Sequence, residues 1–331
     1  MKRKRSKIIE ILAYHYNIQG YTEVYMGTKQ SCLGEIASQV EFKMRRLLAA
    51  CILIVAVMPS PAPAQPSQSV PVEFLCGGEY IRGQFFESAH GDPIATLVLV
   101  PGWPGNPRDV LGLGALLADL NVNVLMFNPR GLHQSEGTST FAHTIEDIAE
   151  SLKWLRQADT RQRFRIDINR IALGGHSYGG GMAMAYAAAD PGIRRVISIA
   201  GNDLGYFIRR IQSDLPFAEQ MRQFMMSTLA PKGPARFDLE ADLKELADHQ
   251  DVYGLKENAG RLSDRSILLI GGWEDEQTTV DDVLLPLYRS LKAAGASDVT
   301  FLTYHDDHGF GTVRQQLAAD IQQWLISHMP K

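Results

Sequence analysis

The sequence predicts a doubly wound α/β domain built on a mostly parallel sheet, and two observations lead to this prediction. From residue 96 to the C-terminus, short continuously apolar runs alternate with longer segments of helical periodicity. Each run stops at glycine, proline or a polar residue, as strands buried on both faces of a parallel sheet do. The 331 residues are 45% hydrophobic and 21% charged, which excludes collagen-like, disordered and coiled-coil chains.

The apolar runs define the expected strands, at residues 96–100, 122–127, 170–173, 196–199, 266–270 and 299–304. We expect helices between them, at residues 109–120, 144–157, 179–189, 280–294 and 312–329. Two earlier segments, 72–75 and 80–86, predict an antiparallel entry hairpin. Because parallel α/β sheets bind ligands at the carboxyl ends of their strands, the chemistry should lie just after these runs.

Residues 202–262 break the alternation, with no convincing strand and with helical segments at 216–229 and 239–249. We interpret this stretch as a helical lid inserted after the strand at 196–199. A lid at this point would cover the strand ends and shape the substrate pocket. The alternative is a long connection that happens to contain two ordinary helices.

The first 64 residues have the features of targeting sequence. Met44-Arg45-Arg46 precedes the apolar residues 47–58, and small residues lie just before Gln65, as in a signal peptide over 44–64. The apolar run is shorter than the ~18 residues of a spanning helix, so an uncleaved anchor is the lesser alternative. We interpret 1–43 as an upstream extension or an over-long start; a long basic leader and a small DNA-binding segment are the alternatives. The hydrolytic domain would then span 65–331.

The clearest chemical motif is Gly175-His176-Ser177-Tyr178-Gly179, between the strand at 170–173 and the helix at 179–189. This G-x-S-x-G pattern in a strand–turn–helix context predicts a sharp turn that exposes a nucleophilic Ser177 at a helix N-terminus. His176 occupies the variable position and is expected to be a packed or rim residue.

A serine hydroxyl needs a general base, and the base needs an acid to orient it. For the base we predict His308, in the loop before the last helix, with His305 as competitor. For the acid we predict Asp275, after the strand at 266–270. Glu274 and Glu276 are its competitors.

The remaining polar candidates have plainer interpretations. The cluster from His305 to His308 could be read as a metal site, but ordinary loop polarity is preferred, and we expect no metal or organic cofactor. Cys76 is expected to be a packed residue. Arg130 is expected either to brace the loop after the strand at 96–100 or to be a surface residue in a turn.

The oxyanion formed during acyl transfer needs hydrogen-bond donors. One predicted donor is the backbone N–H of Tyr178, directly after Ser177. The other is the backbone N–H of Trp103, in the Gly- and Pro-rich loop after the strand at 96–100. Pro101 and Pro104 have no N–H and cannot donate.

Together these motifs resemble the α/β-hydrolase superfamily over about residues 72–331, and within it the prolyl-oligopeptidase, serine aminopeptidase and dienelactone-hydrolase-like relatives. The resemblance implies a serine hydrolase. We expect an exported enzyme, periplasmic or secreted, that cleaves carboxylic esters or amides through an acyl-enzyme. A serine peptidase and an acyltransferase on the same triad are the alternatives. The expected partner is a small ester, amide or peptide substrate; the net charge of −4 gives no reason to expect nucleic acid, and no stable membrane anchor is expected after signal cleavage.

Overall fold

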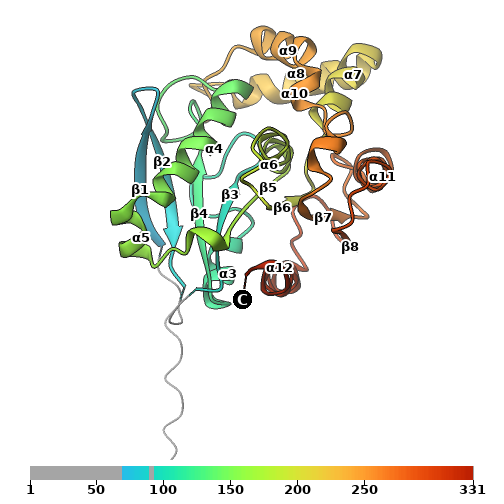
Figure 1. Ribbon diagram of the computed structural model, residues 1–331. Helices are drawn as coiled ribbons and strands as arrows, with labels where there is room; N and C mark the ends of the chain where they lie inside the picture. Colours follow the sequence, from blue (N-terminus) through green and yellow to red (C-terminus); the bar gives the residue numbers. More distant parts are fainter. Residues whose placement is uncertain (1–68, 89–92, 331) are drawn as a thin grey trace, which may run out of the picture. The chain divides into compact units, whose positions relative to one another are not determined.

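Eight strands form one sheet in the order β1-β2-β4-β3-β5-β6-β7-β8 (Figure 1). The computed structural model describes residues 69–88 and 93–330, and the predicted signal peptide and upstream extension lie outside them. β1 pairs antiparallel with β2, β2 pairs antiparallel with β4, and every other pairing is parallel. The strands are β1 Ser69–Cys76, β2 Glu79–Phe86, β3 Ala95–Val100, β4 Val122–Asn128, β5 Ile171–His176, β6 Arg195–Ile199, β7 Ser266–Gly272 and β8 Val299–Tyr304.

Helices fill the connections between the strands. They are α3 Leu113–Asp119, α4 Phe141–Arg156, α5 Ala158–Phe164, α6 Tyr178–Ala189, α7 Leu204–Ser213, α8 Leu215–Thr228, α9 Leu239–Asp248, α10 Gln250–Tyr253, α11 Leu285–Ala293 and α12 Arg314–His328. Short 3-10 turns lie at Ile168–Arg170 and Ala259–Leu262, and a π-helical turn lies at Val280–Leu284. The predicted doubly wound α/β fold, with its entry hairpin, is confirmed.

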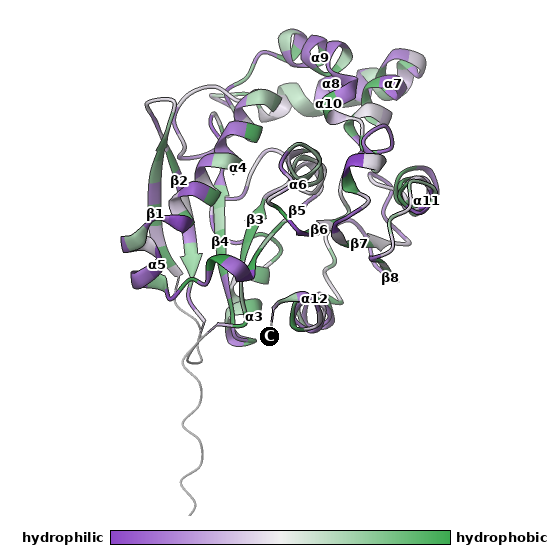
Figure 2. Ribbon diagram, viewed as in Figure 1, coloured by the Kyte–Doolittle hydropathy of each residue, from purple (hydrophilic) through white to green (hydrophobic). Residues whose placement is uncertain are grey.

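The sheet is covered on both faces, and alternate residues of its strands enter different cores. In β3, Val98 and Val100 belong to the core that includes residues of α4, α6 and α11, whereas Leu97 and Leu99 belong to the core that includes residues of α3 and α12. Figure 2 shows hydrophobic residues along the central strands β3, β4 and β5. All residues of β3 and β4 are buried, which is the physical reason for their unbroken apolar runs.

The last strand departs from this expectation. Every residue of β8 is only partly buried, because β8 is an edge strand that pairs with β7 alone. The prediction that residues 299–304 are buried on both faces is therefore wrong, although the strand itself is present.

Helix boundaries differ from the prediction where side chains or proline intervene. The helix expected at 109–120 begins at Leu113, and the Asp109 carboxylate accepts hydrogen bonds from the Gly114 and Ala115 N–H groups. The helix expected at 280–294 is divided, with a π-helical turn before α11 and Pro286 in the first turn of α11. The helices α5, α7 and α10 were not predicted.

The segment between β6 and β7 is helical, as expected. It contains α7 to α10, which Figure 1 shows gathered over one end of the sheet. The helices expected at 216–229 and 239–249 correspond to α8 and α9. Within the described ranges, no helix combines the length and the apolar character that a bilayer crossing requires.

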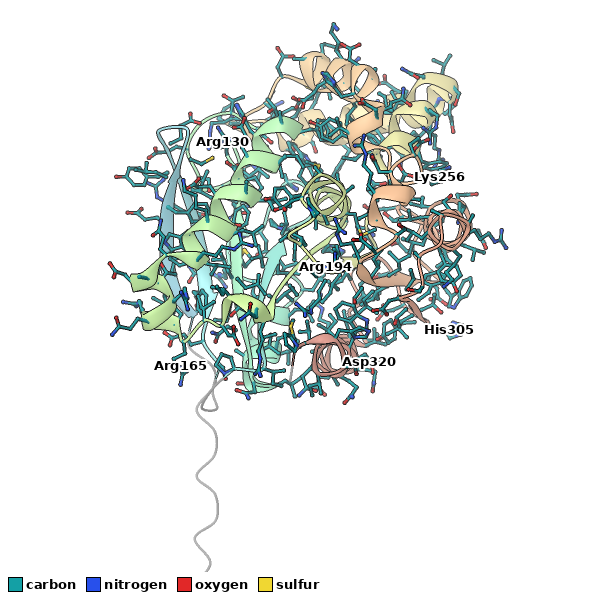
Figure 3. The ribbon with its side chains drawn as sticks, in the orientation of Figure 1. Arg130, Arg165, Arg194, Lys256, His305 and Asp320 are labelled. Atoms are coloured by element: carbon teal, nitrogen blue, oxygen red, sulfur yellow. The ribbon has the colours of Figure 1, made fainter. Side chains whose placement is uncertain are left out.

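A buried ion pair between Arg130, which follows β4, and Asp147 of α4 connects these two elements (Arg130 is labelled in Figure 3). Arg130 is 4% exposed, and its Nε lies 2.7 Å from Oδ1 of the fully buried Asp147. The Arg130 backbone N–H donates to Asp147 Oδ2 at 2.7 Å. Both expectations for Arg130 are wrong: it is not a surface residue, and it braces α4 rather than the loop at 101–107. Cys76 is buried beside this pair, and burial together with Asp147 raises its pKa to about 12, so the thiol stays protonated.

Replacing Asp147 by alanine should destabilise the protein strongly, because the buried Arg130 guanidinium would lose its one fully buried counter-charge in the described chain and keep only the exposed carboxylates of Glu146 and Glu79. Breaking one side of a buried pair costs about 3 kcal/mol or more. Urea denaturation measures this loss of unfolding free energy. The matched control is Lys153→Ala on the same helix, which removes an exposed pair with Glu150 and should change stability by less than about 1 kcal/mol. Equal effects of the two variants would contradict the structural role of Asp147.

Candidate active site

Ser177 lies on a strained turn between β5 and α6. Its backbone has φ 55° and ψ −121°, a conformation that costs a non-glycine residue about 1–3 kcal/mol. The Ser177 N–H donates to the Ile199 carbonyl at 2.9 Å, and the Ser177 carbonyl accepts from Asn202 N–H at 3.1 Å. These bonds join the turn to β6 and to the loop after it, so the surrounding backbone holds the strained conformation in place.

Close backbone packing explains the glycines of the motif. A Cβ on Gly175 would lie 2.3 Å from the Gly179 backbone, and a Cβ on Gly179 would lie 2.3 Å from the Val100 carbonyl oxygen. Real Cβ atoms do not approach so closely. Only glycine at both positions lets α6 begin against the end of β3, directly after Ser177.

His308 and Asp275 are in direct contact. His308 Nδ1 lies 2.7 Å from Asp275 Oδ2. A carboxylate can only accept, so in the neutral tautomer that suits this contact Nδ1 donates to Asp275 and Nε2 keeps its lone pair. The other Asp275 oxygen accepts from the N–H groups of Gln277, at 2.8 Å, and Thr278, at 2.9 Å. Asp275 is therefore held rigidly behind the imidazole.

The competitors occupy other places. His305, labelled in Figure 3, has a side chain that is 88% exposed and pairs with Glu274 at 3.2 Å. Glu276 is exposed at the cavity wall. Asp306 accepts from Thr312 N–H and Asp307 from Gly309 N–H, both at 2.8 Å, so both carboxylates organise the loop that carries His308.

His176 contacts the same loop. Its Nε2 lies 2.9 Å from the His308 carbonyl oxygen, and the two rings lie 4.7 Å apart. Burial, with a contribution from His308, lowers the His176 pKa to about 4, so this imidazole is neutral and donates from Nε2. His176 is packed as expected, and it also fixes the backbone of His308, a role that the sequence pattern does not reveal.

The two predicted oxyanion donors lie on the cavity wall beside Ser177. Tyr178 is the first residue of α6, and in the part of the chain that the structure describes neither its N–H nor that of Trp103 has an acceptor. The Trp103 side chain is fixed by a hydrogen bond from Nε1 to Thr228 Oγ1 at 3.0 Å and by an edge contact with Phe237. Both N–H groups are thus available to a ligand.

Asn128 braces the loop that carries Trp103, and sequence reasoning missed it. Its side-chain oxygen accepts from Asn106 N–H at 2.8 Å, and its amide donates to the Asn106 carbonyl at 2.8 Å. Asn128 follows the apolar run of β4 directly. A primary amide carries a donor and an acceptor on separate atoms and can satisfy a backbone C=O and a backbone N–H together, and such a side chain directly after a buried apolar run is the signal that could have found it.

Ser177 and His308 line one large cavity between the strand ends and helices α7 to α9. Its volume is about 1180 Å³. Most of its lining is apolar, including Trp103, Phe141, Phe207, Phe217, Met221, Phe224, Met225, Leu239, Leu243 and Leu246. Such a cavity suits an apolar or aromatic group beside Ser177.

The fold places Ser177, His308 and Asp275 after the carboxyl ends of β5, β8 and β7. The family model described as "alpha/beta hydrolase fold" matches residues 95–242. The order of strands and the position of Ser177 on the turn after β5 agree with that match. The chain therefore has the α/β-hydrolase fold.

Comparisons with individual proteins support the same fold. The chain is 31% identical over 126 residues to the uncharacterized protein YfhR of Salmonella typhimurium, covering 36% of this chain and 41% of YfhR. It is 34% identical over 127 residues to a proline iminopeptidase of Saccharolobus solfataricus, covering 37% of this chain and 39% of that protein. The matches thus span less than half of these curated relatives. The solved esterase Pf2001 of Pyrococcus furiosus is 15% identical with a TM-score of 0.58, covering 82% of this chain and 97% of that one.

Asn128→Ala should release the loop at residues 101–107, because the Asn106 N–H would lose its acceptor. We expect faster amide exchange at Asn106 and a loss of about 1–3 kcal/mol in the free energy of unfolding. Hydrogen–deuterium exchange and urea denaturation measure the two effects. Asn169→Ala, at an exposed position outside this loop, is the control. Unchanged exchange in Asn128→Ala would show that other contacts hold the loop.

Proposed function

We propose that the protein is an exported serine hydrolase that cleaves carboxylic ester or amide bonds through an acyl-enzyme. The observation that carries this proposal is the 2.7 Å contact of His308 with Asp275, at the wall of a cavity that Ser177 also lines. The strained turn under Ser177 supports its assignment as nucleophile, because such strain persists where the surrounding structure requires it.

In the proposed mechanism, Ser177 Oγ attacks the substrate carbonyl while His308 Nε2 takes its proton. Asp275 stabilises the imidazolium that forms, and the N–H groups of Trp103 and Tyr178 bind the oxyanion. His308 then returns the proton to the leaving alcohol or amine as the C–O or C–N bond breaks. Water, deprotonated by the same imidazole, then attacks the acyl-enzyme carbonyl. His308 returns that proton to Ser177 Oγ as the bond between this oxygen and the acyl carbon breaks, which releases the acid and restores the free enzyme.

Ester cleavage is the first substrate proposal and peptide cleavage the second. The apolar lining of the cavity favours a substrate with a hydrophobic acyl or leaving group. Peptide cleavage is the second proposal because one similar protein is named a proline iminopeptidase. An acyltransferase would use the same residues but pass the acyl group to an alcohol or sugar, which analysis of products with added acceptors distinguishes.

Export rests on residues 44–64 of the sequence alone. We propose cleavage before Gln65 and a periplasmic or secreted product. Expression in a bacterial host with N-terminal sequencing of the exported protein tests this directly, and retention of uncleaved chain in the cytoplasm would contradict it.

Ser177→Ala should abolish hydrolysis of p-nitrophenyl esters of graded chain length, with a loss of about 10³-fold or more in kcat, since no nucleophile remains. A fluorophosphonate probe should label the parent protein at Ser177 and leave the variant unlabelled. Ser213→Ala, which changes an exposed hydroxyl on α7, is the matched control and should keep full activity. Retained ester hydrolysis in Ser177→Ala would remove the proposed mechanism, and a preference for aminoacyl-naphthylamides over esters would favour the peptidase.

Asp275→Asn should lower kcat by about 10³-fold to 10⁴-fold without unfolding the protein. The backbone N–H groups of Gln277 and Thr278 require an oxygen on their side, so the new NH₂ would face His308 Nδ1. The imidazole would then carry its proton on Nε2 and could not accept the proton of Ser177. Steady-state kinetics measures the effect, and Asp307→Asn in the His308 loop is the control, with a much smaller loss. Equal losses would contradict the role of Asp275.

A further inference from the structure

Helix α9 presents an apolar face to the cavity, and one carboxylate interrupts it. Leu239, Leu243 and Leu246 line the cavity at helical spacing, and Asp242 lies among them on the same face. An apolar residue would continue this face at no cost, whereas a carboxylate loses hydration there. Packing against the neighbouring leucines therefore does not explain an aspartate at position 242.

Asp242 is 5% exposed and lines the cavity, yet its carboxylate has no hydrogen-bond or ion-pair partner among the residues that the structure describes. Asp275 is hydrogen-bonded to His308. Asp203 does not line the cavity, and its Oδ1 accepts from the backbone N–H groups of Gly205 and Leu255, although its Oδ2 has no partner among the described residues. Asp242 is the buried carboxylate of the cavity wall that remains available to a ligand.

The groups around Asp242 do not neutralise it. On its own helix it faces Glu245 and Asp238, which are also acidic. From the neighbouring helices α6 and α10 it faces Tyr178 and Tyr253, whose hydroxyls contact Thr144 and Glu245 respectively.

The cations of the cavity are already paired. Arg210 lies 3.5 Å from Asp214 and stacks on Phe217, and Arg222 pairs with Glu240 at 2.5 Å. Neither forms an ion pair with Asp242. The charge that is missing from this part of the cavity is positive.

We propose that Asp242 is a specificity-determining residue that binds a cationic amine of the substrate within the apolar cavity. The substrate class would be an ester or amide that carries a primary or secondary ammonium group on an aliphatic or aromatic stem. This inference rests on the proposed hydrolytic function of the same cavity. An ammonium supplies the charge and the hydrogen bonds that the site lacks, and the leucines around Asp242 accept the stem.

The surroundings of Asp242 disfavour its charged form. Burial, followed by repulsion from Glu245 and Asp238, raises its pKa to about 7. A bound ammonium would lower this pKa again and hold the carboxylate ionised. The influence of Asp242 reaches the residue after Ser177, because its charge adds to the effect of burial in raising the pKa of Tyr178.

The test measures binding to the Ser177→Ala protein by calorimetry, so that it does not depend on turnover. Hexylammonium, 1-hexanol and hexanoate share one apolar stem and differ in the charge of the head group. We expect hexylammonium to bind about tenfold more tightly than 1-hexanol, and hexanoate to bind more weakly than either, as one charge-assisted hydrogen bond predicts. Equal affinities, or no binding of hexylammonium, would overturn the proposal.

Two variants in the same background assign the selectivity. Asp242→Asn should reduce the ratio of hexylammonium to 1-hexanol affinity to about one, whereas Asp248→Asn, an exposed aspartate on the same helix, should leave it unchanged. Selectivity that persists in Asp242→Asn would overturn the assignment. If Asp242→Asn does not fold, the comparison of the three ligands in the Ser177→Ala protein still decides whether the cavity prefers an ammonium group. Selective binding by a protein that hydrolyses no ester or amide would overturn the proposed function and leave the amine site standing.

Discussion

The structure depends on how closely the backbone of α6 approaches the end of β3. The space between the Val100 carbonyl and the start of α6 admits no Cβ at Gly179, and the turn admits none at Gly175. This contact places the start of α6 against the end of β3, directly after Ser177, whose backbone has a positive φ of 55°. The strained serine turn and the first N–H groups of α6 are therefore held next to the loop that follows β3.

Two buried carboxyl groups near the cavity, those of Asp275 and Asp242, differ in how many hydrogen bonds the protein gives them. Asp275 is buried but fully engaged, by His308 on one oxygen and by two backbone N–H groups on the other. Asp242 is buried to a similar degree and has no such partners in the described chain. A carboxylate that the protein itself satisfies can orient an imidazole, whereas one that the protein leaves unsatisfied is suited to a ligand.

Secondary contacts make the site rigid. Asn128 joins β4 to the Trp103 loop, His176 joins the serine turn to the His308 backbone, and Arg130 joins β4 to α4. None of them carries a sequence motif, because each works through a backbone group or a partner that is distant in the chain. The apolar runs located the central strands well, because burial on both faces requires apolar residues along most of each strand. They wrongly predicted that β8 is buried on both faces, because its position at the edge depends on how the whole sheet is assembled.

Local chemistry was enough to determine the strands along the chain and most of the longer helices between them, the position of the serine turn, and the identity of the histidine and the acid that lie together. The sequence predicts these features because glycine, proline and apolar runs determine the backbone conformation of the few residues around them. Only the tertiary structure decided that His305 points to solvent, that Arg130 is buried against α4, and that Asp242 faces a cavity without a partner. Each of these outcomes depends on which distant elements pack around the side chain, and spacing along the chain does not carry that information.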